Sequence, residues 1–247
     1  MEPEEYEKMF VLEDTHWWFL GKRVLAKSYL SLYCNSDKRQ RVLDVGCGTG
    51  GMQRFLRDYG DVSGVDLNLD ALRYAKKKCS GKANLCLSTA LSLPFKDESF
   101  SLVTAFDLLY HRGILDDVKA LREFYRVCRK GGYLLITDSA FDFLRSPHDR
   151  ATHARHRYTK REMAEKVSRA GFSVMRMLYT NFFLFPVVAA VRFFKRYTDK
   201  RDTGSDLHRV NPFLNRVLLA VLRIESLLLR WIVFPCGSSL ICVAQRV

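Results

Sequence analysis

Short apolar runs alternate along this chain with segments in which apolar residues recur at helical spacing. The runs are rich in Val, Leu and Ile and too apolar to leave one face in water, so they predict buried strands. These strands are expected at residues 41–47, 62–67, 84–90, 101–107 and 133–139. The segments between them, at 50–59, 69–79 and 116–129, are predicted helices. This alternation indicates a doubly wound α/β sheet of parallel strands with helices on both faces.

The two ends of the chain predict further elements around this core. Residues 6–32 predict a helical stretch, and residues 159–170 predict a helix that stops at Gly171. Two more strands are expected at 173–180 and 239–246. The segment between them is too long for a connection, so we predict an insertion with its own role.

Composition narrows the class of protein. Apolar residues make up 48% of the 247 residues, which supports a substantial core and excludes intrinsic disorder, collagen and a coiled coil. The seven cysteines have no regular spacing and form no Cys-x-x-Cys pair, which argues against a disulfide framework and a structural zinc site. Residues 1–10 are mainly acidic, so we expect no secretory signal and a reduced, cytoplasmic protein.

The net charge of +13 is concentrated in the second part of the chain. Residues 1–140 carry 21 basic and 19 acidic side chains, whereas residues 141–247 carry 19 basic and 8 acidic ones. This imbalance attracts anions to one part of the surface, and acidic lipid, nucleic acid and a phosphorylated substrate all fit it. A solvated basic face that only maintains solubility is the alternative.

A glycine-rich stretch, VLDVGCGTGG, spans the end of the first predicted strand and the start of a helix. Its Gly46, Gly48 and Gly50 let the backbone turn tightly and approach a ligand. About 20 residues further on, Asp66 ends the second predicted strand, where a carboxylate accepts hydrogen bonds from ribose hydroxyls. Asp44 precedes the loop, and its charge suits a ligand with a cationic amino group better than a pyrophosphate. The alternative is a tight turn that binds no ligand.

Over residues 41–137 the chain resembles the class I S-adenosylmethionine-dependent methyltransferases, in particular the group that includes ubiquinone- and menaquinone-type methyltransferases. The resemblance implies a seven-stranded Rossmann-like sheet and S-adenosyl-L-methionine as the cofactor. It implies cofactor contacts from Asp44, Gly46, Cys47, Gly48 and Gly50 at the methionine end, Asp66 at the ribose, and Leu67, Thr89, Ala90 and Leu91 around the adenine. The family usually has Asp where this chain has Thr89, so the adenine amino group would meet a hydroxyl here. The run FDLLYH, which begins at Phe106, matches the end of the fourth strand, and Phe106 is a further expected contact.

Methyl transfer is an in-line displacement, in which positioning supplies much of the rate and a base is needed only where the acceptor loses a proton. The candidate bases are His111, at the end of the fourth strand, and His148 and His153, in the loop at residues 146–163. The arginines of this loop are candidates for an anion clamp. The alternatives are packing of His111 at the strand end and an ordinary basic loop. No carboxylate–histidine spacing recommends a metal site.

The stretch THWWFLGKR groups two tryptophans with basic residues on the predicted N-terminal helix. Packing in the core is the default for such a cluster. In the family that the chain resembles, N-terminal helices close over the cofactor. Trp17, Trp18 and Lys22 are therefore expected to cover the site, with Trp18 in contact with the cofactor.

Two apolar stretches, at residues 181–197 and 211–235, frame a polar one, and neither is long enough to cross a bilayer. Arg216, Arg223 and Arg230 are seven residues apart and share one stripe of a helix opposite leucines and valines. This pattern is typical of a helix at a membrane surface. It also fits a helix that covers the mouth of the fold.

Glu225 falls among the leucines of that helix. A buried carboxylate needs a partner, so Glu225 is expected to point into the substrate cavity and act on the acceptor.

These patterns predict a single domain over residues 1–247, with a helical lid (1–35), a cofactor-binding core (36–180), an apolar and basic helical insertion (181–237) and the last strand (238–247). The expected activity is methyl transfer to a small-molecule or lipid-linked acceptor, such as a quinone, a glycolipid or a secondary metabolite, at the inner face of an anionic membrane. An RNA methyltransferase that grips phosphates with the basic C-terminal region is the alternative, although no Asn-Pro-Pro-Tyr motif follows the fourth strand. A cofactor-binding regulator without activity is a third interpretation. The oligomeric state is left open.

Overall fold

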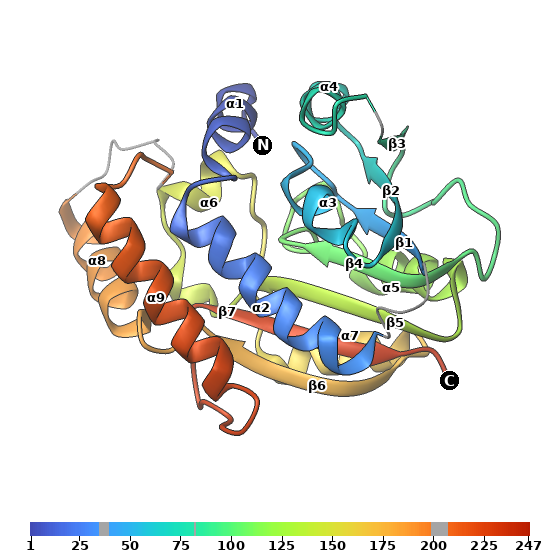
Figure 1. Ribbon diagram of the computed structural model, residues 1–247. Coiled ribbons are helices and arrows are strands. Elements are labelled where there is room, and N and C mark those ends of the chain that lie inside the picture. The colour runs from blue at the N-terminus through green and yellow to red at the C-terminus, as the bar shows by residue number, and fades with distance from the viewer. Residues whose placement is uncertain (35–39, 82, 199–206) are drawn as a thin grey trace.

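The computed structural model describes residues 1–34, 40–81, 83–198 and 207–247. Its strands are β1 (Gln40–Val45), β2 (Gly60–Asp66), β3 (Asn84–Leu87), β4 (Phe100–Phe106), β5 (Cys128–Ser139), β6 (Ser173–Thr180) and β7 (Ser239–Gln245). They form one sheet in the order β3-β2-β1-β4-β5-β7-β6 (Figure 1). Strand β7 runs antiparallel to β5 and β6, and the other pairs run parallel. The predicted seven-stranded sheet is confirmed.

The helices are α1 (Pro3–Leu12), α2 (Trp17–Tyr33), α3 (Gly51–Leu56), α4 (Leu69–Lys78), α5 (Asp117–Val127), α6 (Pro147–Ala151), α7 (Lys160–Arg169), α8 (Phe185–Thr198) and α9 (Pro212–Leu228), with a 3-10 turn η1 (Asp142–Leu144). The helical stretch expected at 6–32 consists of two helices. The chain turns between them, and His16 begins α2 by accepting a hydrogen bond from the amide of Trp18 at 3.3 Å.

Different helices cover the two faces of the sheet, because apolar side chains of the central strands alternate between these faces. On β5, Leu134 and Ile136 pack with residues of α5 and α7. Leu135, between them, packs with residues of α2 and α3 and with the end of α9. All three side chains are fully buried. The strands therefore support two hydrophobic layers, as their apolar sequence predicts.

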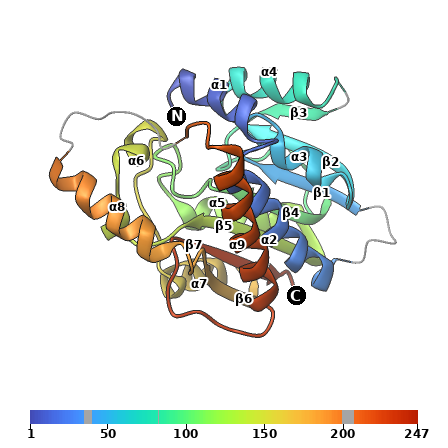
Figure 2. The ribbon, with the colours of Figure 1, turned by 60° about the vertical axis from the view of Figure 1, so that its left-hand side comes forward.

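The insertion contributes α8 and α9, and α9 lies beside α2 (Figures 1 and 2). The hydroxyl oxygens of Ser28 and Ser226 are 2.7 Å apart, and the hydroxyl of Tyr29 donates to the carbonyl of Leu229 at 3.0 Å. One side of α9 therefore packs on α2. Within the described ranges, no helix is both long and apolar enough to span a bilayer.

Candidate active site

The carboxyl ends of β1, β2 and β4 meet at one edge of the sheet, where they form the floor of a cavity of about 390 Å³. Asp44, Asp66 and Phe106 reach the cavity from these three strands. The roof comes from the two N-terminal helices, which contribute Tyr6, Met9, Trp18, Phe19 and Lys22. The N-terminal helices therefore lie over the glycine loop, where a lid was expected.

Asp44 is a buried carboxylate with one unused oxygen. Its Oδ1 accepts a hydrogen bond from the hydroxyl of Thr104 at 2.9 Å, whereas its Oδ2 has no partner among the residues that the structure describes. Burial raises the pKa of Asp44 to about 7, and the carboxylates of Asp66 and Glu13 act in the same direction. A buried polar atom without a partner is unfavourable. Because Asp44 lines the cavity, a cationic ligand group would meet this need.

The glycines of the loop serve two different purposes. Gly46 and Gly48 line the cavity with φ angles of +72° and +52°, in the left-handed region that favours glycine. The amide of Gly48 donates to Oδ2 of Asp66 at 2.9 Å and ties the loop to the end of β2. Gly50 also has a positive φ, but a Cβ there would lie 3.0 Å from the Cα of Ala75. Gly50 therefore allows α3 and α4 to pack and, contrary to expectation, does not belong to the described cavity lining.

The remaining expected cofactor contacts lie toward β2 and β3. Burial raises the pKa of Asp66, whose Oδ1 accepts a hydrogen bond from a backbone amide of the following turn at 2.9 Å. Leu67, Thr89 and Ala90 line the cavity. Leu91 is an exception, because its side chain packs against the hydrophobic core and its amide donates to the hydroxyl of Thr89 at 3.2 Å.

The lining residues fit S-adenosylmethionine. The unpartnered Asp44 oxygen would hold the cationic amino group of its methionine part. Asp66 would hold the ribose, and Thr89 and Ala90 the adenine, while Cys47 and the glycine loop lie between these two ends. When bound, this cofactor supplies a methyl group on a positively charged sulfur.

Residues 43–136 match the family model described as a methyltransferase domain. The ubiquinone/menaquinone biosynthesis C-methyltransferase of Pectobacterium atrosepticum is 34% identical over 119 residues, which cover 44% of this chain and 46% of that protein. Over residues 43–136 this chain is therefore similar to a class I S-adenosylmethionine-dependent methyltransferase domain. The malonyl-[acyl-carrier protein] O-methyltransferase of Hamiltonella defensa is 37% identical over 110 residues, 44% of this chain and 41% of that protein. The match thus spans less than half the length of each relative.

The fold of the methyltransferase domain continues beyond the matched residues. Geranyl diphosphate C-methyltransferase from Streptomyces coelicolor, solved with Mg²⁺, geranyl diphosphate and S-adenosyl-L-homocysteine, superposes with a TM-score of 0.56. The superposition covers 90% of this chain and 77% of that chain at 16% identity. At this identity the likeness shows the fold alone.

Two of the three candidate bases lie at the cavity of the methyltransferase domain. His111 and His148 line it, whereas His153 lies outside the described lining and places its Nε2 2.5 Å from Oε1 of Glu2. The Nδ1 of His111 accepts a hydrogen bond from the amide of Gly113 at 3.0 Å. Burial lowers the pKa of His111 to about 4, so the ring is neutral near pH 7 and a weak base. No three metal-ligating side chains gather in the described parts of the chain.

Two arginines of the histidine-rich loop stabilise that loop. Arg157 forms a buried bidentate ion pair with Asp149, at 2.7 and 3.1 Å, and Arg155 pairs with the buried Asp117. Arg157 is thereby neutralised by its own carboxylate, and Arg155 shares Asp117 with Lys166. This pairing argues against an anion clamp made of Arg155 and Arg157.

Glu225 has the partners that its burial requires, but they are backbone amides. Its Oε1 accepts from the amide of Asn181 at 2.5 Å, and its Oε2 accepts from the amide of Phe183 at 3.2 Å. Glu225 borders a separate pocket of about 20 Å³ beneath α2 and α9 and not the large cavity. Contrary to the expectation for this residue, Glu225 does not line the large cavity, and its carboxylate holds the turn between β6 and α8.

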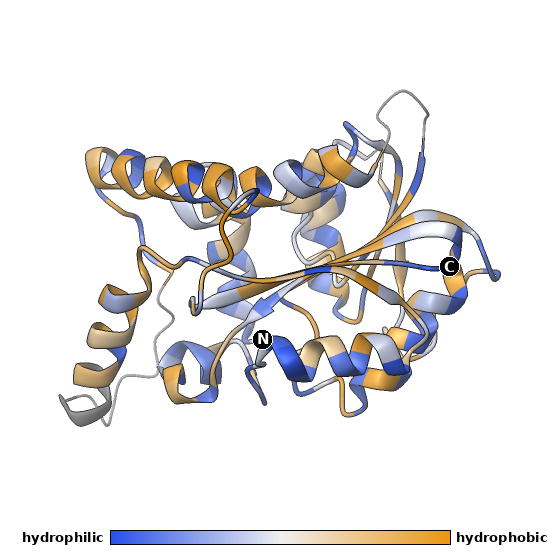
Figure 3. Ribbon diagram, turned by 90° about the horizontal axis from the view of Figure 1, so that it is seen from below, coloured by the Kyte–Doolittle hydropathy of each residue, from blue (hydrophilic) through white to orange (hydrophobic). Residues whose placement is uncertain are grey.

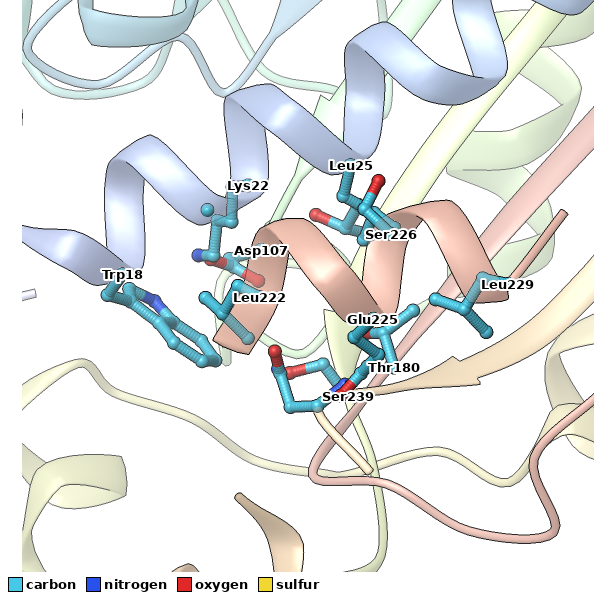
Figure 4. Close-up of a pocket in the computed structure, with 13 residues that line it drawn as sticks. Trp18, Lys22, Leu25, Asp107, Thr180, Leu222, Glu225, Ser226, Leu229 and Ser239 are labelled. Carbon is cyan, nitrogen blue, oxygen red and sulfur yellow. The ribbon is translucent and has the colours of Figure 1, made fainter. Parts of the chain in front are cut away.

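Sequence reasoning missed two acidic residues of the cavity, Asp107 and Glu13. Asp107 directly follows β4 and forms an ion pair with Lys22 of α2, which was expected only as part of the lid (Figure 4). The available signal was a charged residue at the carboxyl end of a buried strand, where such sheets bind ligands. Glu13 lies after α1 and accepts a hydrogen bond from the hydroxyl of Thr49 at 2.8 Å. No local pattern marks this contact, because it depends on how α1 folds over the loop.

Proposed function

We propose that this protein transfers a methyl group from S-adenosylmethionine to a small-molecule or lipid-linked acceptor, such as a quinone, a glycolipid or a secondary metabolite. The observation that carries the proposal is the unpartnered oxygen of Asp44 in a cavity that Asp66 and the glycine loop also line. The two relatives named above, one from quinone biosynthesis and one named for malonyl-[acyl-carrier protein], support methyl transfer with different acceptors.

Binding and transfer can be tested in sequence. Calorimetric titration with S-adenosylmethionine and S-adenosylhomocysteine should give heat of association for both, and its absence for both would overturn the proposal. Methyl-labelled S-adenosylmethionine is then incubated with cell extract separated into organic-soluble molecules, water-soluble small molecules and RNA. Label in either small-molecule fraction supports the proposal, and label in the organic one favours a lipid-linked acceptor. Label confined to RNA would establish the RNA methyltransferase alternative instead.

We further propose that α9 brings the protein to an anionic membrane surface. The side of α9 that faces away from α2, together with the turn after the helix, exposes Phe213, Val217, Ile224, Leu227 and Trp231, which we call the apolar face. Phe213 is 76% exposed and Trp231 87% exposed. In Figure 3, orange (hydrophobic) residues predominate along α9, which lies at the upper left, and blue (hydrophilic) residues interrupt them. Exposed apolar surface of this extent marks an interaction site.

The charges beside the apolar face favour an anionic lipid surface over a protein partner. Arg216, Arg223 and Arg230 are exposed, and at about 100° per residue they lie along one edge of the apolar face. Glu225 is the only acidic residue between 207 and 247, and it is buried. An apolar face with an exposed tryptophan and an arginine edge is typical of helices that lie in the bilayer interface.

Sedimentation with lipid vesicles tests the membrane contact. We expect binding to vesicles that contain phosphatidylserine, weaker binding to pure phosphatidylcholine, and release by salt. Trp231→Ser and Arg223→Glu should each weaken binding, whereas Leu115→Ser, at a site 83% exposed outside the insertion, should not. Equal binding of all three variants, or binding to RNA and not to vesicles, would contradict the membrane proposal.

A further inference from the structure

The small pocket beneath α2 and α9 and the cofactor cavity share a wall made of Trp18, Lys22 and Asp107 (Figure 4). Lys22 and Asp107 form an ion pair at this wall. Asp107 lies at the carboxyl end of β4, the edge at which sheets of this type bind their ligands. The charged pair therefore lies between the small pocket and the cofactor cavity.

The backbone at Asp107 has an uncommon conformation. Its φ angle is +51°, in the left-handed region, and its amide donates to the carbonyl of Thr137 on β5 at 2.8 Å. Aspartate tolerates this region better than most residues, and backbone strain of this kind is concentrated at functional sites. The fold thus fixes Asp107 at the shared wall.

Lys22 places a charge in aromatic surroundings. Its Nζ lies 4.9 Å from the ring centroid of Trp18 and 5.9 Å from that of Phe19, and its side chain is 13% exposed. Burial lowers the pKa of Lys22 to about 7, and the carboxylate of Asp138, at the end of β5, acts against this shift. The cation is held by Asp107 and by the aromatic faces.

The small pocket behind this pair is lined mostly by apolar atoms, together with residues that carry hydroxyl groups. Thr137, Thr180 and Ser239 contribute to it from the ends of β5 and β6 and the start of β7. Oγ1 of Thr137, a residue only 3% exposed, has no hydrogen-bond partner in the described parts of the chain. Buried hydroxyls are nearly always paired, so an unpaired one that borders a pocket points to a ligand atom. With a volume of about 20 Å³, the pocket holds one polar group of about the size of a water molecule.

We propose that the Lys22–Asp107 pair, beside the small pocket, binds a hydroxyl group of the methyl acceptor and that Asp107 deprotonates it, so that the product is a methyl ether. This inference rests on the proposed function. A protonated amine would be repelled by Lys22, and a carboxylate or phosphate would be repelled by Asp107. A hydroxyl satisfies both, because it donates to the carboxylate and accepts from the ammonium. The rings of Trp18 and Phe19 suit an acceptor whose hydroxyl is attached to an aromatic ring.

The proposed step conserves atoms and charge. The acceptor oxygen forms a bond to the methyl carbon while the carbon–sulfur bond breaks and its electron pair stays on sulfur. The hydroxyl proton passes to the carboxylate of Asp107, so the positive charge on sulfur and the negative charge on Asp107 disappear together. In its protonated form, Lys22 stabilises the negative charge that develops on the acceptor oxygen.

Three naphthalene probes that differ in one group test the choice of acceptor. 1-Naphthol, 1-naphthylamine and 1-naphthoic acid present a hydroxyl, an amine and a carboxylate on the same apolar ring. Calorimetry with the S-adenosylhomocysteine complex should show the tightest binding for 1-naphthol, and mass spectrometry should find its methyl ether after incubation with S-adenosylmethionine. Preference for the amine or the acid, or methylation at a ring carbon, would overturn the inference.

Substitutions at Lys22, Asp107 and Thr137 distinguish a role in the reaction from a role in folding. Asp107→Asn should lower kcat on the order of 100-fold while leaving affinity for S-adenosylmethionine nearly unchanged. Lys22→Met should raise KM for 1-naphthol, and Lys22→Arg should restore its binding because the charge returns. Thr137→Val should weaken 1-naphthol binding and raise Tm, because it removes an unpaired buried hydroxyl. Lys27→Met, at an exposed position of α2, is the matched control and should behave as the wild type.

Two measurements on the wild type, cofactor binding and naphthol methylation, separate the possible outcomes. If the wild type does not bind S-adenosylmethionine, the proposed function itself is wrong. If it binds S-adenosylmethionine but neither binds nor methylates 1-naphthol, only the assignment of the Lys22–Asp107 wall fails. Wild-type kcat in a folded Asp107→Asn variant would also remove that assignment.

Discussion

Replacing Asp44 with Asn should raise the free energy of unfolding of the unliganded protein and weaken cofactor binding. Burial raises the pKa of Asp44 from 3.8 to about 7. A carboxylate whose folded pKa exceeds its unfolded one destabilises the fold progressively as pH rises from about 4 to about 7. This difference corresponds to about 4 kcal/mol of unfolding free energy above pH 7. Asn removes this cost of the buried charge but leaves a buried amide without a partner, which costs about 1–3 kcal/mol. The net increase in unfolding free energy is therefore on the order of 1–3 kcal/mol.

Asp44→Asn should lower the affinity for S-adenosylmethionine. The cationic amino group of the ligand loses a buried counter-charge, and breaking such a pair costs about 3–5 kcal/mol, or at least about 100-fold in Kd. In the wild type, the carboxylate is mostly protonated at about pH 6, so affinity should fall about tenfold between about pH 8 and about pH 6. The Asn variant keeps Asp66 but should lose most of this pH dependence.

Urea denaturation and calorimetric titration, each at about pH 6 and about pH 8, check both halves of this prediction. Asp58→Asn is the control, because Asp58 is exposed and lies outside the cavity lining. A less stable Asp44→Asn variant would show that Asp44 is a structural residue. Unchanged affinity for S-adenosylmethionine would show that the cation does not bind at Asp44.

Three further substitutions test other parts of the site. Glu225→Gln should lower the free energy of unfolding by about 1–3 kcal/mol in urea titrations, since one of two accepting oxygens becomes a donor facing an amide, and it should leave affinity for S-adenosylmethionine unchanged. Lys78→Met breaks a buried ion pair, 2.6 Å long, with Glu13, and should cost about 3–5 kcal/mol in the same assay; a loss below about 1 kcal/mol would count against it. Thr89→Asp supplies the acid usual in the family, and calorimetry should show S-adenosylmethionine bound up to about tenfold more tightly.

Features that depend on neighbouring residues were predictable from the sequence. The alternation of β5 between two hydrophobic layers follows from its uninterrupted apolar run. The positive φ angles of Gly46 and Gly48 follow from a glycine-rich turn between a strand and a helix. The position of Asp66 at the cavity follows from its place at the end of the second strand.

Features that depend on the meeting of distant segments were not predictable in the same way. A helical wheel places Glu225 on the buried side of α9, but it cannot show that its partners are amides more than 40 residues earlier in the chain. The pairing of Lys22 with Asp107 likewise depends on how α2 crosses the end of β4. Gly50 was likewise misassigned from the motif, because this glycine allows two helices to pack and does not line the ligand cavity.

The two lid helices, α1 and α2, are attached to the rest of the protein in different ways. This difference suggests separate entry routes for the cofactor and the acceptor. α2 is fixed along α9 by buried contacts. α1 is held near its ends, by Glu13 with Lys78 of α4 and by Glu2 with the loop before α7. Movement of α1 would break these polar contacts and uncover the cofactor cavity, while the Lys22–Asp107 pair on α2 stays in place. We therefore expect the cofactor to enter beneath α1. The acceptor would then reach Lys22 from the side of α9, the helix proposed to face the bilayer.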